Sequence, residues 1–99
     1  MNQVRVTILE AIARRRAISA RYNGGTLTLA PHLLYERHGD LFVGAFNLSK
    51  AWRSEAERQL GHFKLRGLGD VALSDETFEP LPTYEAVTPR AGDTLVFAI

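Results

Sequence analysis

Two short turns divide the first half of the chain into segments in which apolar and polar residues alternate. The first turn, Asn23-Gly24-Gly25, separates residues 18–22 from residues 26–30. The second, Arg37-His38-Gly39-Asp40, precedes residues 41–47. Alternation with a period of two predicts strands, and Asn and Gly tolerate the positive φ that tight hairpin turns require. The sequence therefore predicts antiparallel hairpins at the start of a small β-sheet.

A helix is expected before these hairpins. Val4, Ile8, Ala11 and Ile12 recur at helical spacing, which predicts an amphipathic helix over about residues 3–15. Pro31 lacks a backbone N–H, so it should mark an edge, a bend or a bulge rather than the middle of a central strand.

The second half of the chain is expected to add further strands. They are predicted at residues 60–65 and about 70–74, and the apolar residues of 94–99 are suited to a last strand in the C-terminal tail. Residues 48–59 are polar and fit a long connecting loop or a short helical turn. One helix followed by five or six short strands predicts a mainly β fold, a small bent sheet or barrel over about residues 17–79.

Length and composition restrict the class of protein. Ninety-nine residues make one domain, and the absence of cysteine excludes disulfides and thiolate metal sites. No apolar run approaches the roughly 20 residues of a membrane span. The sequence begins with a helical pattern and shows no signal-peptide core, so we expect a cytoplasmic protein with no membrane contact.

Charge is distributed unevenly along the chain. Residues 1–66 hold 11 Lys/Arg and 5 Asp/Glu, whereas residues 67–99 hold 1 Lys/Arg and 6 Asp/Glu. Two explanations are open: the basic part meets an anionic partner, or the acidic part folds back and pairs with it.

The segment His62-Phe-Lys-Leu-Arg-Gly-Leu68 has one apolar and one basic side. If the segment is extended, Phe63 and Leu65 face one way, and the polar side chains face the other. That second set consists of His62, Lys64 and Arg66. A strand that is cationic on one side suggests contact with something anionic.

Several of these segments resemble the WYL domain family, over roughly residues 6–80. The matching elements are Ile8-Leu9-Glu10-Ala11-Ile12, Ile18 with Tyr22-Asn23-Gly24, Pro31 with Leu34, Gly39, Phe63-Lys64-Leu65-Arg66-Gly67-Leu68, and Phe78-Glu79-Pro80. Leu41-Phe42-Val43 stands at the position of the family's Trp-Tyr-Leu tripeptide. Gly61 and Gly67 stand where the family commonly has arginine, and Arg66 stands where it commonly has an acidic residue.

The resemblance implies an Sm-like, SH3-type β-barrel preceded by a helix. It also implies ligand sensing in bacterial transcription regulation, with nucleotides, single-stranded nucleic acid or other anions as ligands. Such regulators normally carry a DNA-binding helix-turn-helix before the domain. Only about three residues precede the predicted helix here. The expectation is therefore a stand-alone member that works with a separate DNA-binding partner protein or as a homo-oligomer.

Catalytic and metal sites are not expected. The three imidazoles, His32, His38 and His62, lack metal-ligand spacing and are interpreted as surface or turn residues. Asp75 and Glu76 are more easily explained as solvated turn residues than as an acid–base pair. We therefore predict a protein that is not an enzyme and needs no cofactor or metal.

The binding hypothesis rests on cations beside aromatic rings, because arginine pairs with phosphate and rings stack on bases. The expected ligand-binding residues are Tyr22, Arg53, Arg58, His62, Lys64 and Arg66. Tyr22 could instead be a core residue, and Trp52 either pins the polar connector to the barrel or marks a contact surface. The leading hypothesis is a regulatory domain that binds a nucleotide or single-stranded nucleic acid. The alternative is an assembly module that acts through barrel edges or the 94–99 segment.

Overall fold

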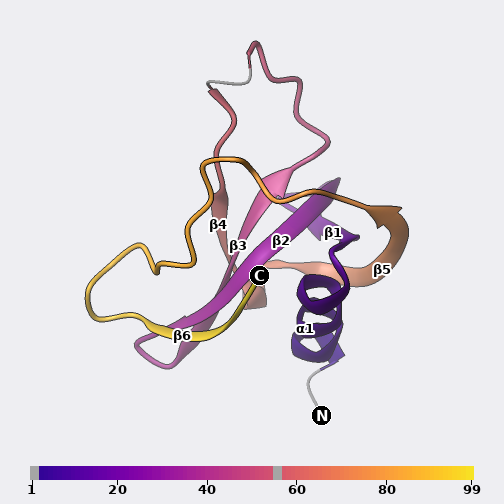
Figure 1. The fold of residues 1–99 in the computed structure, drawn as a ribbon. Coiled ribbons are helices and arrows are strands. Elements are labelled where there is room, and N and C mark those ends of the chain that lie inside the picture. The colour runs from indigo at the N-terminus through magenta and orange to yellow at the C-terminus, as the bar shows by residue number, and fades with distance from the viewer. Residues whose placement is uncertain (1–2, 55–56) are drawn as a thin grey trace.

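One helix precedes six strands that form a single antiparallel sheet in the computed structural model, which describes residues 3–54 and 57–99 (Figure 1). The elements are α1 (Gln3–Arg14), β1 (Arg16–Tyr22), β2 (Gly25–Arg37), β3 (Asp40–Asn47), β4 (Gly61–Lys64), the 3-10 helix η2 (Leu65–Gly67), β5 (Gly69–Thr77) and β6 (Thr94–Ala98). The predicted mainly β fold with an N-terminal helix is confirmed. Among the described residues, no helix has both the length and the apolar character to cross a bilayer.

The long strand β2 organises the sheet. The strands follow the order β4-β3-β2-β1-β5, and β6 pairs with β2 outside this path. One edge of β2 pairs with β3, and the other pairs first with β1 and then with β6. No pairing joins β4 to β5 in the described residues, so the sheet is open rather than a fully paired barrel.

Both predicted turns are present. Asn23 and Gly24 have φ values of 50° and 81°, and His38 and Gly39 have 52° and 81°. Two consecutive residues with positive φ are typical of the two-residue turns whose twist matches that of a hairpin. The β1–β2 and β2–β3 hairpins are therefore confirmed.

Pro31 lies at a register shift inside β2. Pro31 pairs with Ala45, but the next residue paired on β3 is Leu33, opposite Gly44. The two segments expected on either side of Pro31 are therefore one strand that bends. The shift changes which side chains share a face of β2. Leu29 and Leu34 both belong to the hydrophobic core that also contains the buried side of α1, called the inner core below. Leu33 and Tyr35 lie on the opposite, outer face.

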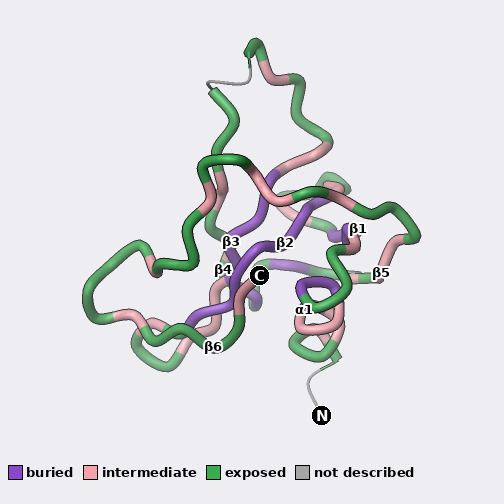
Figure 2. Tube along the Cα trace, in the orientation of Figure 1, coloured by how far each residue is buried: buried purple, intermediate pink, exposed green. Residues whose placement is uncertain are grey.

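The inner core joins α1 to the strands, and Figure 2 shows buried residues in both. Ile8, Ala11 and Ile12 of α1 are buried there. The strand and η2 residues of this cluster include Ile18, Ala20, Leu29, Leu34, Val43, Ala45 and Leu65.

The C-terminal segment covers part of the outer face. After β5 the chain crosses the sheet and returns as β6 beside β2 (Figure 1). On that face Leu33 is 1% exposed and Tyr35 is fully buried. The segment after β5 therefore belongs to the folded domain rather than forming a free tail.

Candidate anion-binding surfaces

Lys64 and Arg66, at the end of β4 and in η2, converge on one carboxylate. Lys64 Nζ lies 3.4 Å from Asp40 Oδ2, and Arg66 Nη1 donates to Asp40 Oδ1 at 3.0 Å. Although desolvation works in the opposite direction, these two cations lower the pKa of Asp40. The two positive charges therefore share an internal counter-ion.

His62 lies further along β4 and contacts Tyr35. Its Nδ1 is 3.1 Å from the Tyr35 hydroxyl, and the two rings are 5.8 Å apart. Burial and then the charge of Arg37 lower the pKa of His62. Both effects disfavour the charged form of His62, although Asp93 acts in the opposite direction.

Trp52 pins the connector between β3 and β4 to the sheet. Its ring stacks on Phe46 with centroids 5.2 Å apart, and its Nε1–H donates to the Asn47 carbonyl at 3.0 Å. The Lys50 ammonium lies 4.5 Å from the centroid of the Trp52 ring. Of the two roles expected for Trp52, the structure shows the pinning role.

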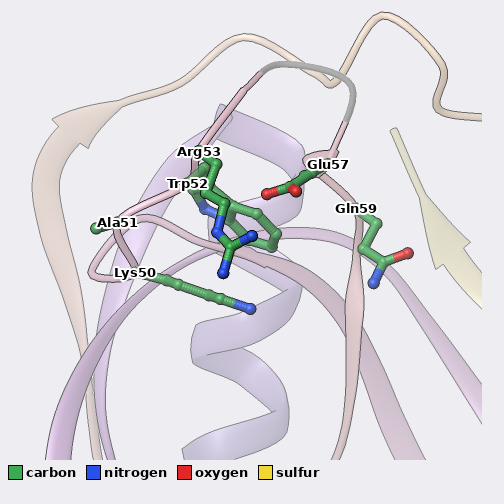
Figure 3. A pocket seen from close by; sticks show the side chains of 6 residues that line it. All are labelled: Lys50, Ala51, Trp52, Arg53, Glu57 and Gln59. Atoms are coloured by element: carbon green, nitrogen blue, oxygen red, sulfur yellow. The ribbon is translucent and has the colours of Figure 1, made fainter.

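A hollow of about 480 Å³ opens beside Trp52 (Figure 3). It is lined by Lys50, Ala51, Trp52, Arg53, Glu57 and Gln59. In Figure 3 the Arg53 guanidinium lies in front of the Trp52 ring, and the Lys50 ammonium lies below it. Neither cation forms an ion pair with any residue of the described ranges. Glu57 is the one described carboxylate in the lining.

Arg58 belongs to a neighbouring hollow. Its guanidinium lies 5.9 Å from the Phe46 centroid, and it lines a space of about 350 Å³ together with residues 76–82. On the same face of β3, Lys64 lies 5.8 Å from the centroid of Phe42. Phe42 and Phe46 are four residues apart, roughly 13 Å along a strand. Of the expected site residues, Lys64 and Arg66 thus share one carboxylate, whereas Arg53 and Arg58 line two separate hollows.

Tyr22 lies apart from both groups. Its ring packs edge-on against Phe63 with centroids 5.2 Å apart, and it is half-buried at the margin of the inner core. Its neighbours are those of a core residue.

Arg37 is a residue that the sequence analysis missed. Its Nε and Nη2 donate to the two carboxylate oxygens of Asp93 at 2.7 and 2.9 Å. The guanidinium lies 4.9 Å from the Phe42 centroid and 5.5 Å from that of Tyr35. The uneven charge distribution was the signal for such a contact. Arg16–Asp75, Arg21–Asp70 and Arg37–Asp93 all join the basic part to the acidic part, which confirms internal pairing.

His32 is fully buried, so its interpretation as a surface or turn residue was wrong. Its Nδ1 lies 2.7 Å from the Ala30 carbonyl, and its Nε2 accepts from the Leu81 N–H at 3.1 Å. The ring stacks on Phe78 at 5.3 Å and meets Tyr84 edge-on at 5.0 Å. Desolvation lowers its pKa. The bend at Pro31 turns this side chain toward the C-terminal segment, a position that the sequence pattern does not reveal.

Metal ligands do not gather in the part of the chain that the structure describes, where no group of three His, Asp or Glu residues is close enough to hold an ion. No family model matches the chain, and no curated protein shows significant sequence similarity to it.

Proposed function

We propose that this protein is a non-catalytic regulatory domain of the WYL type that binds an anionic ligand, a nucleotide or single-stranded nucleic acid. The order β4-β3-β2-β1-β5 with a leading helix and a 3-10 helix between β4 and β5 is compatible with an Sm-like, SH3-type barrel. The sequence resemblance supports the same assignment. In that case a separate DNA-binding partner protein would bind the regulated DNA.

The observation that carries the proposal is the hollow in front of Trp52. Lys50 and Arg53 present cations there without an ion-pair partner in the described residues, next to an aromatic ring. Its volume of about 480 Å³ falls within the usual range of small-ligand pockets. Arginine binds phosphate through paired hydrogen bonds, and the base of a bound nucleotide could stack on the nearby Trp52 ring. Lys64 and Arg66 have less capacity for an anion because Asp40 already neutralises part of their charge.

Fluorescence anisotropy with short labelled single strands and a nucleotide panel, at low and moderate salt, tests the proposal. Binding should weaken as salt rises, because phosphate contacts release counterions. The double variant K50Q/R53Q should bind at least about tenfold more weakly than the wild type. R14Q/R21Q removes the same charge from exposed positions on α1 and β1 and serves as the control.

The absence of binding at low salt by a folded sample would refute the anionic-ligand function. If K50Q/R53Q and R14Q/R21Q lose the same binding affinity, the hollow is not the binding site, because nonspecific attraction depends on total charge.

One observation favours a second function, assembly with another chain through β6. Leu95, Val96 and Phe97 are 43%, 37% and 39% exposed, and within the described residues β6 pairs along one edge only. A strand with a free edge and exposed apolar side chains pairs readily with another edge. Sedimentation of the full chain should then show association that a chain ending at residue 88 lacks. A monomer in both cases would contradict this function.

A further inference from the structure

The contacts of the Asp93 side chain are those expected for the carboxylate of a separate ligand bound at this position. In the β2–β6 register Thr94 lies opposite Glu36, which places Asp93 opposite Arg37. The Arg37 guanidinium grips both oxygens of Asp93, and Oδ2 also accepts from the Arg90 N–H at 3.0 Å. The Asp93 side chain is 1% exposed. Paired N–H···O bonds of this kind are among the strong and geometrically specific contacts of proteins.

The strand that follows Asp93 is held mainly by its backbone. β6 pairs antiparallel with residues 33–36 of β2, and the Ile99 N–H donates to the His32 carbonyl at 3.0 Å. Its three central side chains, from Leu95 to Phe97, remain exposed. Ile99, directly after the strand, also packs against the inner core. A backbone ladder with anchored side chains is the way in which sheet edges recognise extended peptides.

We propose that the edge of β2 from residue 33 to residue 37 is a docking site for an extended segment of a partner protein, in which an Asp or Glu precedes a strand. Residues 93–99 of the chain occupy this site in cis. The inference goes beyond the assembly function above, because it uses the β2 edge that β6 covers and does not depend on the free edge of β6.

The partner must be acidic at this position because the vacated site is positive. Without Asp93, the Arg37 guanidinium would lie beside Tyr35 and Phe42 with no carboxylate bound to it in the described structure. The β2–β3 hairpin carries two carboxylates of its own. Glu36 precedes Arg37 in β2, so its side chain alternates to the other face of the sheet. Asp40 already pairs with Lys64 and Arg66. The Arg37 side chain is 16% exposed, and a largely buried cation without a partner is costly, so an incoming carboxylate restores the lost contact.

A partner strand could replace residues 93–99 on β2, because residues 93–99 hold the site mainly by being part of the same chain. Their attachment to the chain gives them a high effective concentration. Asp93 and Ile99 at their two ends are packed, whereas the exposed side chains of Leu95 to Phe97 contribute little to holding them. A change that weakens the cis contact therefore raises the fraction of open sites, and the apparent affinity for a partner rises in proportion.

The probe is a labelled peptide with the sequence of residues 90–99, added to the full-length chain and followed by fluorescence anisotropy. The D93N chain should bind it at least about tenfold more tightly than the wild type, because its own strand is less firmly anchored. A peptide carrying Asn in place of Asp93 should not bind, and R37Q/D93N should lose the gain. The matched control is D75N, which removes one exposed carboxylate that pairs with Arg16 and should behave as the wild type.

Two results would overturn the inference: D93N binds the peptide no better than D75N, or the Asp and Asn peptides bind equally. Should D93N unfold, NMR of the wild-type chain with millimolar peptide keeps the test decisive, because amide shifts must appear at residues 33–37 and in β6. Their absence would overturn the inference. D93N also separates the two assembly models, since loosening β6 should weaken association through its free edge and strengthen peptide binding.

Discussion

Gly44 allows the outer face of the sheet to close around Leu33. A Cβ built at Gly44 would overlap Leu33 Cδ2 and would approach His62 Cε1 to 3.3 Å. Leu33 is 1% exposed, so its side chain has little room to move aside. The glycine in the middle of β3 is required by close packing rather than by its backbone conformation.

We expect Gly44→Ala to lower the free energy of unfolding by about 1–3 kcal/mol, the usual cost of overpacking a filled space. Gly92→Ala is the control, because a Cβ there meets nothing within 4 Å. Urea unfolding of both variants measures the difference. A Gly44→Ala protein as stable as Gly92→Ala would show that Leu33 can repack.

His32 should make the stability of the protein depend on pH. Because desolvation lowers its pKa below the usual value for histidine, the unfolded chain binds the proton more readily than the folded one. Its contribution is therefore fully present above about pH 6.5 and is lost as the pH falls below that value. Burial raises the pKa of Tyr84, the titratable side chain in ring contact with it, so Tyr84 stays neutral throughout this range.

The melting temperature should therefore fall less between pH 7.5 and pH 5.5 in His32→Asn than in the wild type. His62 also has a lowered pKa and contributes with the same sign, so His62→Asn is measured alongside. If His32→Asn retains the wild-type slope, His32 is not the titrating group. Absolute stabilities are not compared, because removing the ring also removes its contacts with Phe78 and Tyr84.

At the scale of elements, β3 presents aromatic side chains on its outer face, each beside a cation. Phe42 lies near Arg37 and Lys64, and Phe46 lies near Arg58. The difference between the two ends of β3 is the presence of counter-ions. The Phe42 end contains Asp40 and Asp93, whereas Arg58 at the Phe46 end has no ion pair within the described part of the chain.

Asp40→Asn should strengthen the binding of a labelled single strand and steepen its salt dependence, because it frees Lys64 and Arg66 for phosphate. Asp70→Asn makes the same change of charge beside Arg21 on the β1–β5 pair and is the control. Anisotropy titrations at two salt concentrations compare them. Equal effects would show that the β4–η2 cations do not contact the ligand.

At the scale of the whole molecule, ion pairs join the N-terminal basic part to the C-terminal acidic part. Arg16–Asp75 and Arg21–Asp70 join β1 to β5, and Arg37–Asp93 joins β2 to the segment before β6. Exposed pairs contribute little to stability, whereas breaking a buried pair leaves a charge without compensation.

Asp93→Asn should therefore lower the melting temperature more than Asp75→Asn or Asp70→Asn does. Thermal unfolding at low and high salt measures the ranking, and the loss in Asp93→Asn should persist at high salt because buried pairs are screened less. Three equal losses would mean that the Arg37–Asp93 pair behaves as a surface contact.

Local patterns predicted the elements well, and contacts between distant residues account for what they missed. Helical spacing in α1, alternation in β1 and β3 and the Asn23-Gly24 turn depend on neighbouring residues, so they could be inferred directly. The pairing of Lys64 with Asp40 crosses from β4 to β3, and the ring contact of His32 with Tyr84 spans half the chain. No local pattern encodes such contacts.

The helix, the hairpins and the division of the chain into a basic and an acidic part could be inferred from the sequence alone, because periodicity, turn residues and charge act over a few positions. Which cations are neutralised depends on contacts between distant parts of the chain. The bend at Pro31 sets the outward side chains of β2, and the return of the chain as β6 brings Asp93 to Arg37. Lys50 and Arg53 remain beside Trp52 because the connector is pinned to Phe46, away from the carboxylates of the C-terminal segment that the ion pairs hold elsewhere.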